Sequence, residues 1–283
     1  MPTPRRAVAA ATTILAALIC LVGASSPATA DPPRVGRAHV PHVFTGQAFD
    51  TCTAPSLSVL HAWRRSSPYG AVGIYIGGRN RACDQFRLTP AWIRSATSLG
   101  WRLLPLYVGS QAPCLDRSLG STRINPRRAS ATGAGEGRDA VRAARGLGLG
   151  PGSPVYLDME AYNRGGRCTY AVLQYTTAWT QAVHAAGYLS GFNSSADAGI
   201  ADLAAAAAHH SSAVRGGLPD VIWYARWDRR DTVNGYRALH PGQWPGPRRV
   251  HQFRANTTER HGGVTLRIDR DSVYAPVAVV SRA

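Results

Sequence analysis

The chain of 283 residues contains no lysine, so all 32 of its basic residues are arginine. With 16 acidic residues the formal net charge is +16, yet the arginines are scattered and form no long basic run. No RNA- or DNA-binding motif accompanies them, so we expect no nucleic-acid partner. A positive surface of this kind suits contact with an anionic cell envelope or an acidic glycan.

Motifs for metals and nucleotides are missing as well. There is no His-x-His or His-Glu-x-x-His motif, and the adjacent His209 and His210 would diverge around a helix axis. The absence of a C-x-x-C spacing argues against a zinc site. Residues 50–55 are not a Gly-rich phosphate loop, which disfavours a doubly wound nucleotide-binding sheet. We therefore expect neither a metal nor a cofactor.

The first 30 residues are typical of a secretory signal peptide. Arg5 and Arg6 precede an uncharged apolar run, residues 7–22, and Ala28-Thr29-Ala30 offers a cleavage site. The run is short for a membrane span, so we expect no stable membrane insertion after cleavage. The arginine pair permits export by either the Sec or the Tat route. We expect a secreted or cell-wall-associated monomer.

A polar lead-in, residues 31–45, is followed by a single expected domain, residues 46–283, in which short apolar runs alternate with helical patterns. The expected strands are residues 47–52, 71–76, 102–108, 154–160, 189–193, 221–225, 250–253 and 265–269. The expected helices are residues 56–65, 89–99, 137–147, 170–186 and 197–209. Thr89 is the expected N-cap of the second helix, with Pro90 at its first position. This alternation predicts an α/β fold, a (β/α)8 TIM-like barrel with irregular later units.

The most informative segment is residues 154–162, a short apolar strand that ends in Asp158 and Glu160. Successive strand side chains alternate faces, so both carboxylates point to the same side, about 6.6 Å apart along the backbone. Like charges at this spacing raise one of the two pKa values. Such a pair can supply the acid and the base or nucleophile of glycoside hydrolysis. The alternative is that the two acids simply end a strand and cap the next helix.

Other polar and aromatic residues fall at the carboxyl ends of the expected strands, where TIM barrels carry their active sites. Asp50 ends the first strand and Asp269 the eighth, so both are expected to join the acid pair. The expected sugar-binding residues are Tyr107, Gln111, Asn193, Trp223, Trp227 and Gln252. Structural roles are expected for Trp92, Trp101 and Trp179 in the core, and for Asp197 and Asp202 in helix capping or on the surface.

Four cysteines remain after the expected cleavage, namely Cys52, Cys83, Cys114 and Cys168. An even number outside the cytoplasm predicts two disulfides, although four cysteines allow three pairings. The four lie just after the first four expected strands. We favour Cys52–Cys83 and Cys114–Cys168, because each pair would join consecutive loops and stiffen the rim of the site.

Several segments, in order, resemble a secreted actinobacterial glycoside-hydrolase-like domain family long classed as a domain of unknown function. The segments are GQAFDTCTAP (46–55), VGIYIGG (72–78), YLDME (156–160), GYLSG (187–191) and IWYA (222–225). The resemblance covers essentially the whole mature chain. More remotely, the chain is similar to glycoside hydrolase family 25, the lysozyme-like muramidases. That family carries an Asp on its first strand, a D-x-E pair on its fourth and an Asp near its last strand, which match Asp50, Asp158 with Glu160, and Asp269.

The remote resemblance implies that Glu160 is the general acid and that Asp158 positions or stabilises the reacting sugar. Asp158 would alternatively hold a substrate acetamido group that attacks in place of a protein nucleophile. The family 25 enzymes lack this cysteine pattern and have a different loop where Thr51-Cys52-Thr53 follows the first Asp.

The leading hypothesis is an exported glycoside hydrolase acting on cell-wall glycan, in particular peptidoglycan. One rival is a barrel that binds wall glycan without cleaving it. Another is a metal-dependent hydrolase in which Asp50, Asp158 and Asp269 bind a cation.

Overall fold

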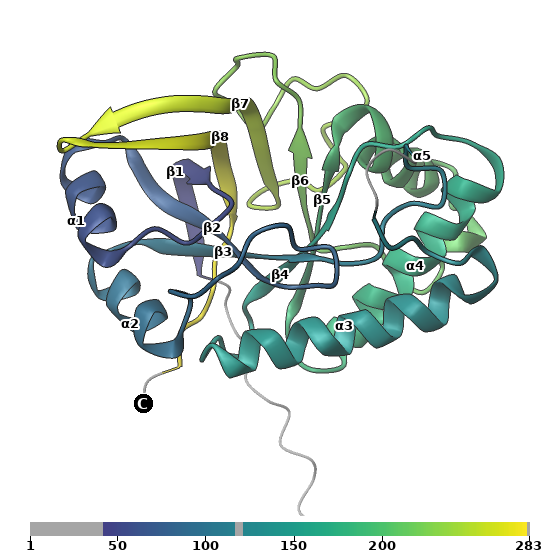
Figure 1. The fold of residues 1–283 in the computed structure, drawn as a ribbon. Helices are drawn as coiled ribbons and strands as arrows, with labels where there is room; N and C mark the ends of the chain where they lie inside the picture. The colour runs from purple at the N-terminus through teal and green to yellow at the C-terminus, as the bar shows by residue number, and fades with distance from the viewer. Residues whose placement is uncertain (1–41, 117–120, 282–283) are drawn as a thin grey trace, which may run out of the picture. The chain divides into compact units, whose positions relative to one another are not determined.

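The apolar runs of the sequence form eight strands that close into one barrel in chain order (Figure 1). The computed structural model describes residues 42–116 and 121–281, which lie within the compact unit His39–Ala283. The expected signal peptide, residues 1–30, and the lead-in up to residue 41 lie outside the described residues. None of the helices in the described ranges has the length and hydropathy that a membrane crossing requires.

The first seven strands run parallel, and the last is antiparallel to both of its neighbours. The strands are β1 (Val43–Asp50), β2 (Tyr69–Gly77), β3 (Arg102–Val108), β4 (Pro154–Met159), β5 (Leu189–Ser195), β6 (Val221–Ala225), β7 (Arg249–His261) and β8 (Val264–Pro276). Because seven strands point the same way, their carboxyl ends gather at one end of the barrel. Strand β1 already begins within the expected lead-in.

Each of the first five strands is followed by a helix. The helices are α1 (Leu57–Ser66), α2 (Pro90–Ser98), α3 (Ala129–Gly146), α4 (Gly166–His184) and α5 (Ala201–Ala208). A π-helical turn, Ala196–Ile200, leads into α5, and short 3₁₀ turns lie at Pro126–Arg128 and Ser212–Val214. The expected cap of α2 is confirmed, because Thr89 accepts a hydrogen bond from the Trp92 amide and Pro90 occupies the first turn.

The alternation of strands and helices stops after α5, so the expected eightfold repeat is only partly formed. Residues 226–248, all of them described, connect β6 to β7 without an α-helix. Strands β7 and β8 are then joined directly by Gly262 and Gly263, both with positive φ. Two glycines in this conformation make a tight hairpin turn. The described architecture is therefore a mixed α/β fold with a closed eight-stranded barrel, in which five strand–helix units precede three strands.

The last two strands are much longer than expected. The sequence predicted residues 250–253 and 265–269, whereas β7 and β8 each have 13 residues. Their outer halves, Arg254–His261 and Val264–Arg267, alternate exposed and half-buried residues rather than forming apolar runs. Only one face of such a hairpin is covered by the rest of the protein, so exposed and covered residues alternate along each strand. A search for continuous apolar runs therefore misses these strands.

Two apolar clusters hold the barrel. Alternate strand residues point inward, such as Ala48 and Leu104, and form the inner cluster. Their neighbours, such as Phe49, point outward and contact the helices. Trp92, Trp101 and Trp179 belong to this outer cluster, which confirms the core role expected for them. The inner cluster closes the barrel below the polar residues at the carboxyl ends.

Candidate active site

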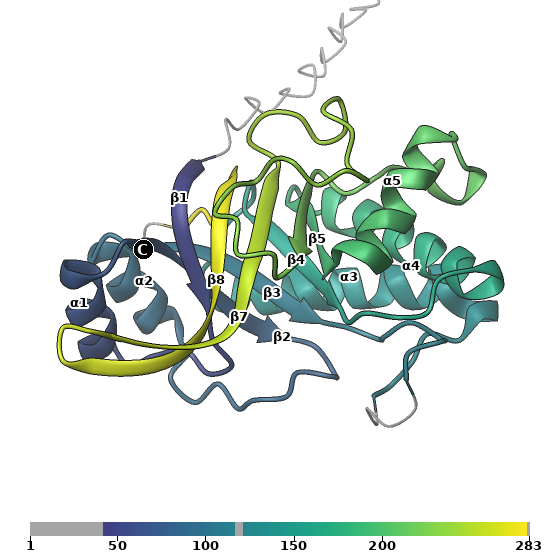
Figure 2. The same cartoon turned by 90° about the horizontal axis from the view of Figure 1, so that it is seen from above.

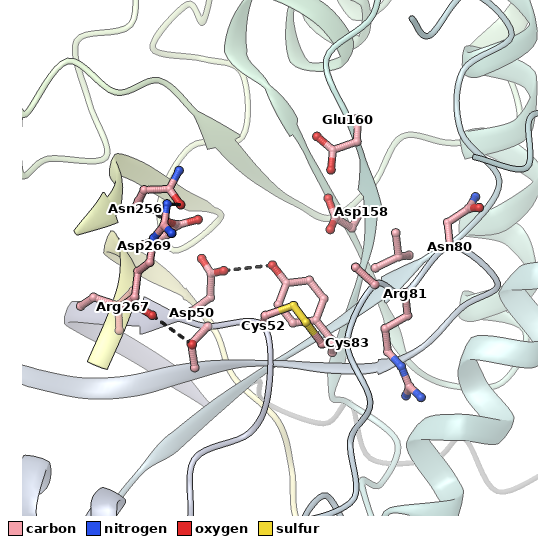
Figure 3. Close-up of a pocket in the computed structure, with 15 residues that line it drawn as sticks. Asp50, Cys52, Asn80, Arg81, Cys83, Asp158, Glu160, Asn256, Arg267 and Asp269 are labelled. Atoms are coloured by element: carbon pink, nitrogen blue, oxygen red, sulfur yellow. Dashed lines mark hydrogen bonds between the residues drawn. A yellow bond between two sulfur atoms is a disulfide. The ribbon is translucent and has the colours of Figure 1, made fainter. Parts of the chain in front are cut away.

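Four carboxyl groups line one cavity of about 540 Å³ at the carboxyl end of the barrel. Asp50 ends β1, Asp158 lies near the end of β4, Glu160 follows β4, and Asp269 lies on β8. Figure 3 shows Asp158 and Glu160 on one side of the cavity and Asp50 and Asp269 on the other. The four positions selected from the sequence therefore lie together.

Asp50 is almost fully buried and is held by two donors. The Tyr75 hydroxyl donates to Oδ1 over 2.9 Å, and the Gln252 side-chain amide donates to Oδ2 over 3.0 Å. Burial, followed by the nearby charge of Asp269, raises the pKa of Asp50 to about 7, against the opposing effect of the two donors. Asp50 thus titrates near neutrality.

The acid pair at the end of β4 combines the half-buried Asp158 and the exposed Glu160. Burial, with the charges of Glu160 and Asp50, raises the pKa of Asp158 well above its ordinary value. Glu160 is exposed at the cavity mouth, where the surrounding walls remove enough water to raise its pKa as well. Within the described residues no side chain donates a hydrogen bond to the Asp158 carboxyl, which leaves that group available to a ligand.

Gln111 holds the backbone of this pair. Its side-chain amide donates to the Asp158 carbonyl over 3.0 Å and to the Gly109 carbonyl over 3.1 Å. Its side-chain carbonyl accepts from the Glu160 amide over 2.8 Å. Gln111 is 1% exposed. The sequence predicted a sugar contact, but burial leaves Gln111 a positioning role instead.

Asp269 closes the opposite wall of the cavity. Its carboxyl accepts from the backbone amide of Asn256 over 2.6 Å and from the side-chain amide of Gln252 over 3.3 Å. Burial raises its pKa, while the Asn256 amide and the Arg267 charge oppose that rise. Because Gln252 donates to both Asp50 and Asp269, its amide links the two acids on this wall.

Asp271 is an acid that the sequence analysis missed. It is fully buried inside the barrel, and its Oδ1 accepts from the Trp223 indole over 3.0 Å. Its Oδ2 is buried and accepts no hydrogen bond from any donor in the described structure. Burial, with the charges of Asp50 and Asp269, raises its pKa well above the ordinary value. The D-x-D spacing of residues 269 and 271 on one strand is the signal in the sequence that could have indicated it.

Trp223 and Tyr107 do not contact the cavity, contrary to expectation. Trp223 is fully buried in the inner cluster. Tyr107 points outward, where its hydroxyl donates to Asp139 on α3 over 2.6 Å and its ring contacts Trp179. Both residues are only a position or two from strand ends, and the alternation of strand faces decides where they point.

A second cavity of about 560 Å³ adjoins the first and shares Tyr75, Asp158, Glu160 and Asp269 with it. It is lined in addition by Asn193, Trp227 and Gln252, three of the residues that the sequence analysis expected to bind sugar. Trp227 is 64% exposed, and its indole donates to Gln252 over 3.0 Å. An exposed indole anchored by its nitrogen presents a flat apolar face to the cleft. The acid pair therefore lies between two compartments of one cleft.

The two expected disulfides are confirmed. Cys52–Cys83 joins the loops after β1 and β2, and both cysteines line the first cavity. Cys114–Cys168 joins the loop after β3 to the start of α4. These bonds restrain the loops that surround the acid pair. Within the described residues no group of three or more His, Cys, Asp or Glu side chains is arranged to hold a metal ion.

The sequence suggested helix capping or a surface position for Asp202, but the structure places this residue in the interior. It is 4% exposed and accepts from Tyr162 over 2.7 Å, from Thr169 over 2.7 Å and from Arg164 over 2.6 Å. It therefore ties the chain that follows Glu160 to α5. Asp197 is exposed, as expected, and pairs with Arg226 at the second cavity.

Solved structures with a similar fold share little sequence with this chain. An uncharacterized B. stearothermophilus protein aligns with a TM-score of 0.55 and 17% identity, over 80% of this chain and 95% of its own. The Mycobacterium tuberculosis Tat-secreted protein Rv2525c aligns with a TM-score of 0.51 and 12% identity, over 82% of this chain and 96% of its own. At these identities the two alignments show a common fold. No curated protein sequence matches the chain.

A family model gives the sequence-level relationship. The model of the Rv2525c-like, glycoside hydrolase-like domain matches residues 61–273. The match spans most of the chain and runs from α1 to β8, so it includes the acid pair on β4 and Asp269 on β8. This chain belongs to the Rv2525c-like glycoside hydrolase-like domain family.

Proposed function

We propose that this protein is an exported glycoside hydrolase that cleaves a cell-wall glycan, in particular peptidoglycan. The observation that carries the proposal is the cleft itself. Asp158 and Glu160 lie between two adjoining cavities, each large enough for part of a saccharide chain. The family membership and the exposed Trp227 support a carbohydrate ligand. The barrel is then an irregular TIM-like barrel with its site at the strand carboxyl ends.

Glu160 is the proposed general acid, because it is the exposed carboxyl at the mouth of the cleft. A bound sugar displaces water from Glu160, which raises its pKa further and favours protonation. The proton moves from Glu160 to the glycosidic oxygen as the bond between that oxygen and the anomeric carbon breaks. Asp158, lacking a donor of its own, then stabilises the positive charge on the sugar or holds an acetamido group that attacks the anomeric carbon.

The acids of the opposite wall orient this chemistry. Asp50 and Asp269 share the Gln252 amide and face the acid pair across the cavity. Their oxygens are placed to accept hydrogen bonds from sugar hydroxyls. Gln111 holds the backbone of Asp158 and Glu160, so the acid pair is fixed before the substrate binds.

One observation favours a second candidate, a barrel that binds glycan without cleaving it. The pKa values of Asp50, Asp158, Glu160, Asp269 and Asp271 are all raised. A raised pKa works against the ionised acid that a two-carboxylate glycosidase needs, whereas hydrogen bonding to a sugar does not require an ionised acid.

The variant Glu160→Gln separates the two candidates, because the amide keeps the shape of the side chain but carries no transferable proton. We expect fragment release from purified peptidoglycan, followed by mass spectrometry, to fall about 10²–10⁴-fold. Pull-down on the insoluble wall should be unchanged. The matched control is Asp139→Asn, an acid-to-amide change at a half-exposed site on α3.

Retained cleavage by Glu160→Gln would exclude Glu160 as the acid. Binding without cleavage by the wild type, across a broad panel of glycans, would establish the second candidate instead.

A further inference from the structure

The outer half of the β7–β8 hairpin projects beyond the barrel and lies over α1 (Figures 1 and 2). The Trp63 indole of α1 donates to the Val264 carbonyl over 3.1 Å, and the His261 ring lies 4.8 Å from the Trp63 ring. Gly262 approaches α1 so closely that a Cβ would meet the Ala62 carbonyl. The inner face of this hairpin is thus fixed on the helix.

The opposite face of the hairpin is exposed and carries no acid. The pairs Thr258–Arg267 and Arg260–Thr265 lie directly across the two strands, so the four side chains share one face. All four residues are exposed. The single acid in this outer half, Glu259, points the other way and bonds to Tyr69. We call these four residues the hairpin platform.

The platform is continuous with the cleft. Arg267 and Asn256 line the first cavity together with the four acids. The Arg267 guanidinium donates to the Asn256 side chain over 2.9 Å, and the Asn256 amide donates to Asp269. Thr265 and Arg260 lie one strand repeat further out, about 6.8 Å from Arg267 along the hairpin. A chain that leaves the first cavity along the hairpin therefore meets this face.

The two arginines of the platform differ in their surroundings, because the charge of Arg267 acts on Asp269 whereas Arg260 has no such partner in the described structure. On the inner face, Arg270 lies 3.5 Å from Glu259. On the platform, Arg260 makes no ion pair with any acid in the described structure. A guanidinium with free N–H groups binds a carboxylate through two parallel hydrogen bonds, and the neighbouring threonine hydroxyls match sugar hydroxyls.

We propose that the hairpin platform binds the sugar carboxylates of an acidic polysaccharide whose neighbouring unit occupies the cleft. The inference rests on the proposed function for what happens in the cleft, and it adds the substrate class. That class is a glycan with carboxylates on its own sugar units, held by Arg267 near the cavity and by Arg260 further out.

The test compares two matched ligands, a fluorescent hyaluronan octasaccharide and the same octasaccharide with its carboxylates reduced to alcohols. Binding is measured by anisotropy in the Glu160→Gln background, which prevents turnover. We expect the acidic ligand to bind more tightly, and Arg260→Gln to reduce that preference about tenfold, the effect of losing one charge-assisted contact. Arg138→Gln, an exposed arginine on α3, is the charge-matched control.

Equal binding of the two ligands would overturn the inference, as would equal losses in Arg260→Gln and Arg138→Gln, which would assign the preference to net charge alone. The result is separable from the proposed function. Peptidoglycan cleavage without an acid preference refutes only the platform, whereas an acid preference without cleavage by the wild type refutes only the hydrolase.

Discussion

At the scale of single residues, the cleft is defined by acids that are removed from water. Asp50 and Asp271 lie in the barrel interior, and both have raised pKa values because burial disfavours their charged forms. Asp271 keeps one oxygen without a donor in the described structure, which further disfavours its charged form. The acids at the base of the cleft therefore link the stability of the barrel to pH.

Asp50 provides a direct test of this linkage. Its pKa rises from 3.8 to about 7 on folding, so its contribution to stability is complete below pH 3.8 and is lost as the pH rises through 7. Asp50→Asn does not titrate. We therefore expect the free energy of unfolding of the variant, relative to wild type, to increase between pH 4 and pH 8 by at least about 1 kcal/mol.

Urea unfolding at the two pH values measures this difference. Any effect of the amide on the free energy of unfolding that does not depend on pH cancels when the values at pH 4 and pH 8 are subtracted. A flat difference for Asp50→Asn would show that its titration is not coupled to folding.

At the scale of elements, the loop after β3 determines how the acid pair is held. Gln111 is tied into this loop through its backbone, with its amide donating to Thr122 and its carbonyl accepting from Ile124. Its side chain meanwhile bonds to the backbone at both acids. Cys114 joins the same loop to α4. The carboxyl end of β4 is therefore supported from a neighbouring loop rather than from its own strand.

We expect Gln111→Ala to lower the free energy of unfolding by about 1–3 kcal/mol, because it leaves buried backbone groups without partners. If the proposed function holds, fragment release should fall more than wall binding, since the acids lose their alignment. Denaturant titration and the two wall assays provide the measurements. Gln181→Ala removes a comparable bond at an exposed position and should change stability little. Equal effects of the two variants would argue against a specific role for Gln111.

At the scale of the whole molecule, two disulfides connect consecutive units of the barrel. They close stretches with sequence separations of 31 and 54 residues. Cross-links of this length stabilise mainly by restricting the unfolded chain. Both lie on the side of the cleft formed by the first four units, whereas half of the residues that line the second cavity come after β5. The first compartment is therefore the more strongly restrained.

Replacing Cys52 and Cys83 together by serine should lower the free energy of unfolding by about 2–5 kcal/mol. Thiol titration of the denatured, unreduced wild type should find no free thiol among the four paired cysteines. The Cys114→Ser and Cys168→Ser double variant gives the comparison for the longer stretch. A double variant as stable as the wild type would mean that the disulfide does not contribute to folding.

Local sequence patterns were sufficient for the features that depend on neighbouring residues. The apolar runs predicted the first six strands, and Thr89 with Pro90 predicted a helix start. The strand-end acids Asp50, Asp158, Glu160 and Asp269 were selected because strand ends are visible in the sequence as a change from apolar to polar residues. The cysteine pairs followed from loop order. Their roles in catalysis remain predictions.

Only the tertiary structure decided which side chains reach the cleft. Tyr107 and Trp223 lie close to strand ends, yet one points to α3 and the other into the barrel, because a shift of one residue reverses the face of a strand. The antiparallel β7–β8 hairpin and the buried Asp271 depend on pairing between distant strands. That pairing is set by backbone hydrogen bonds and closure of the barrel, which no local pattern of residues records.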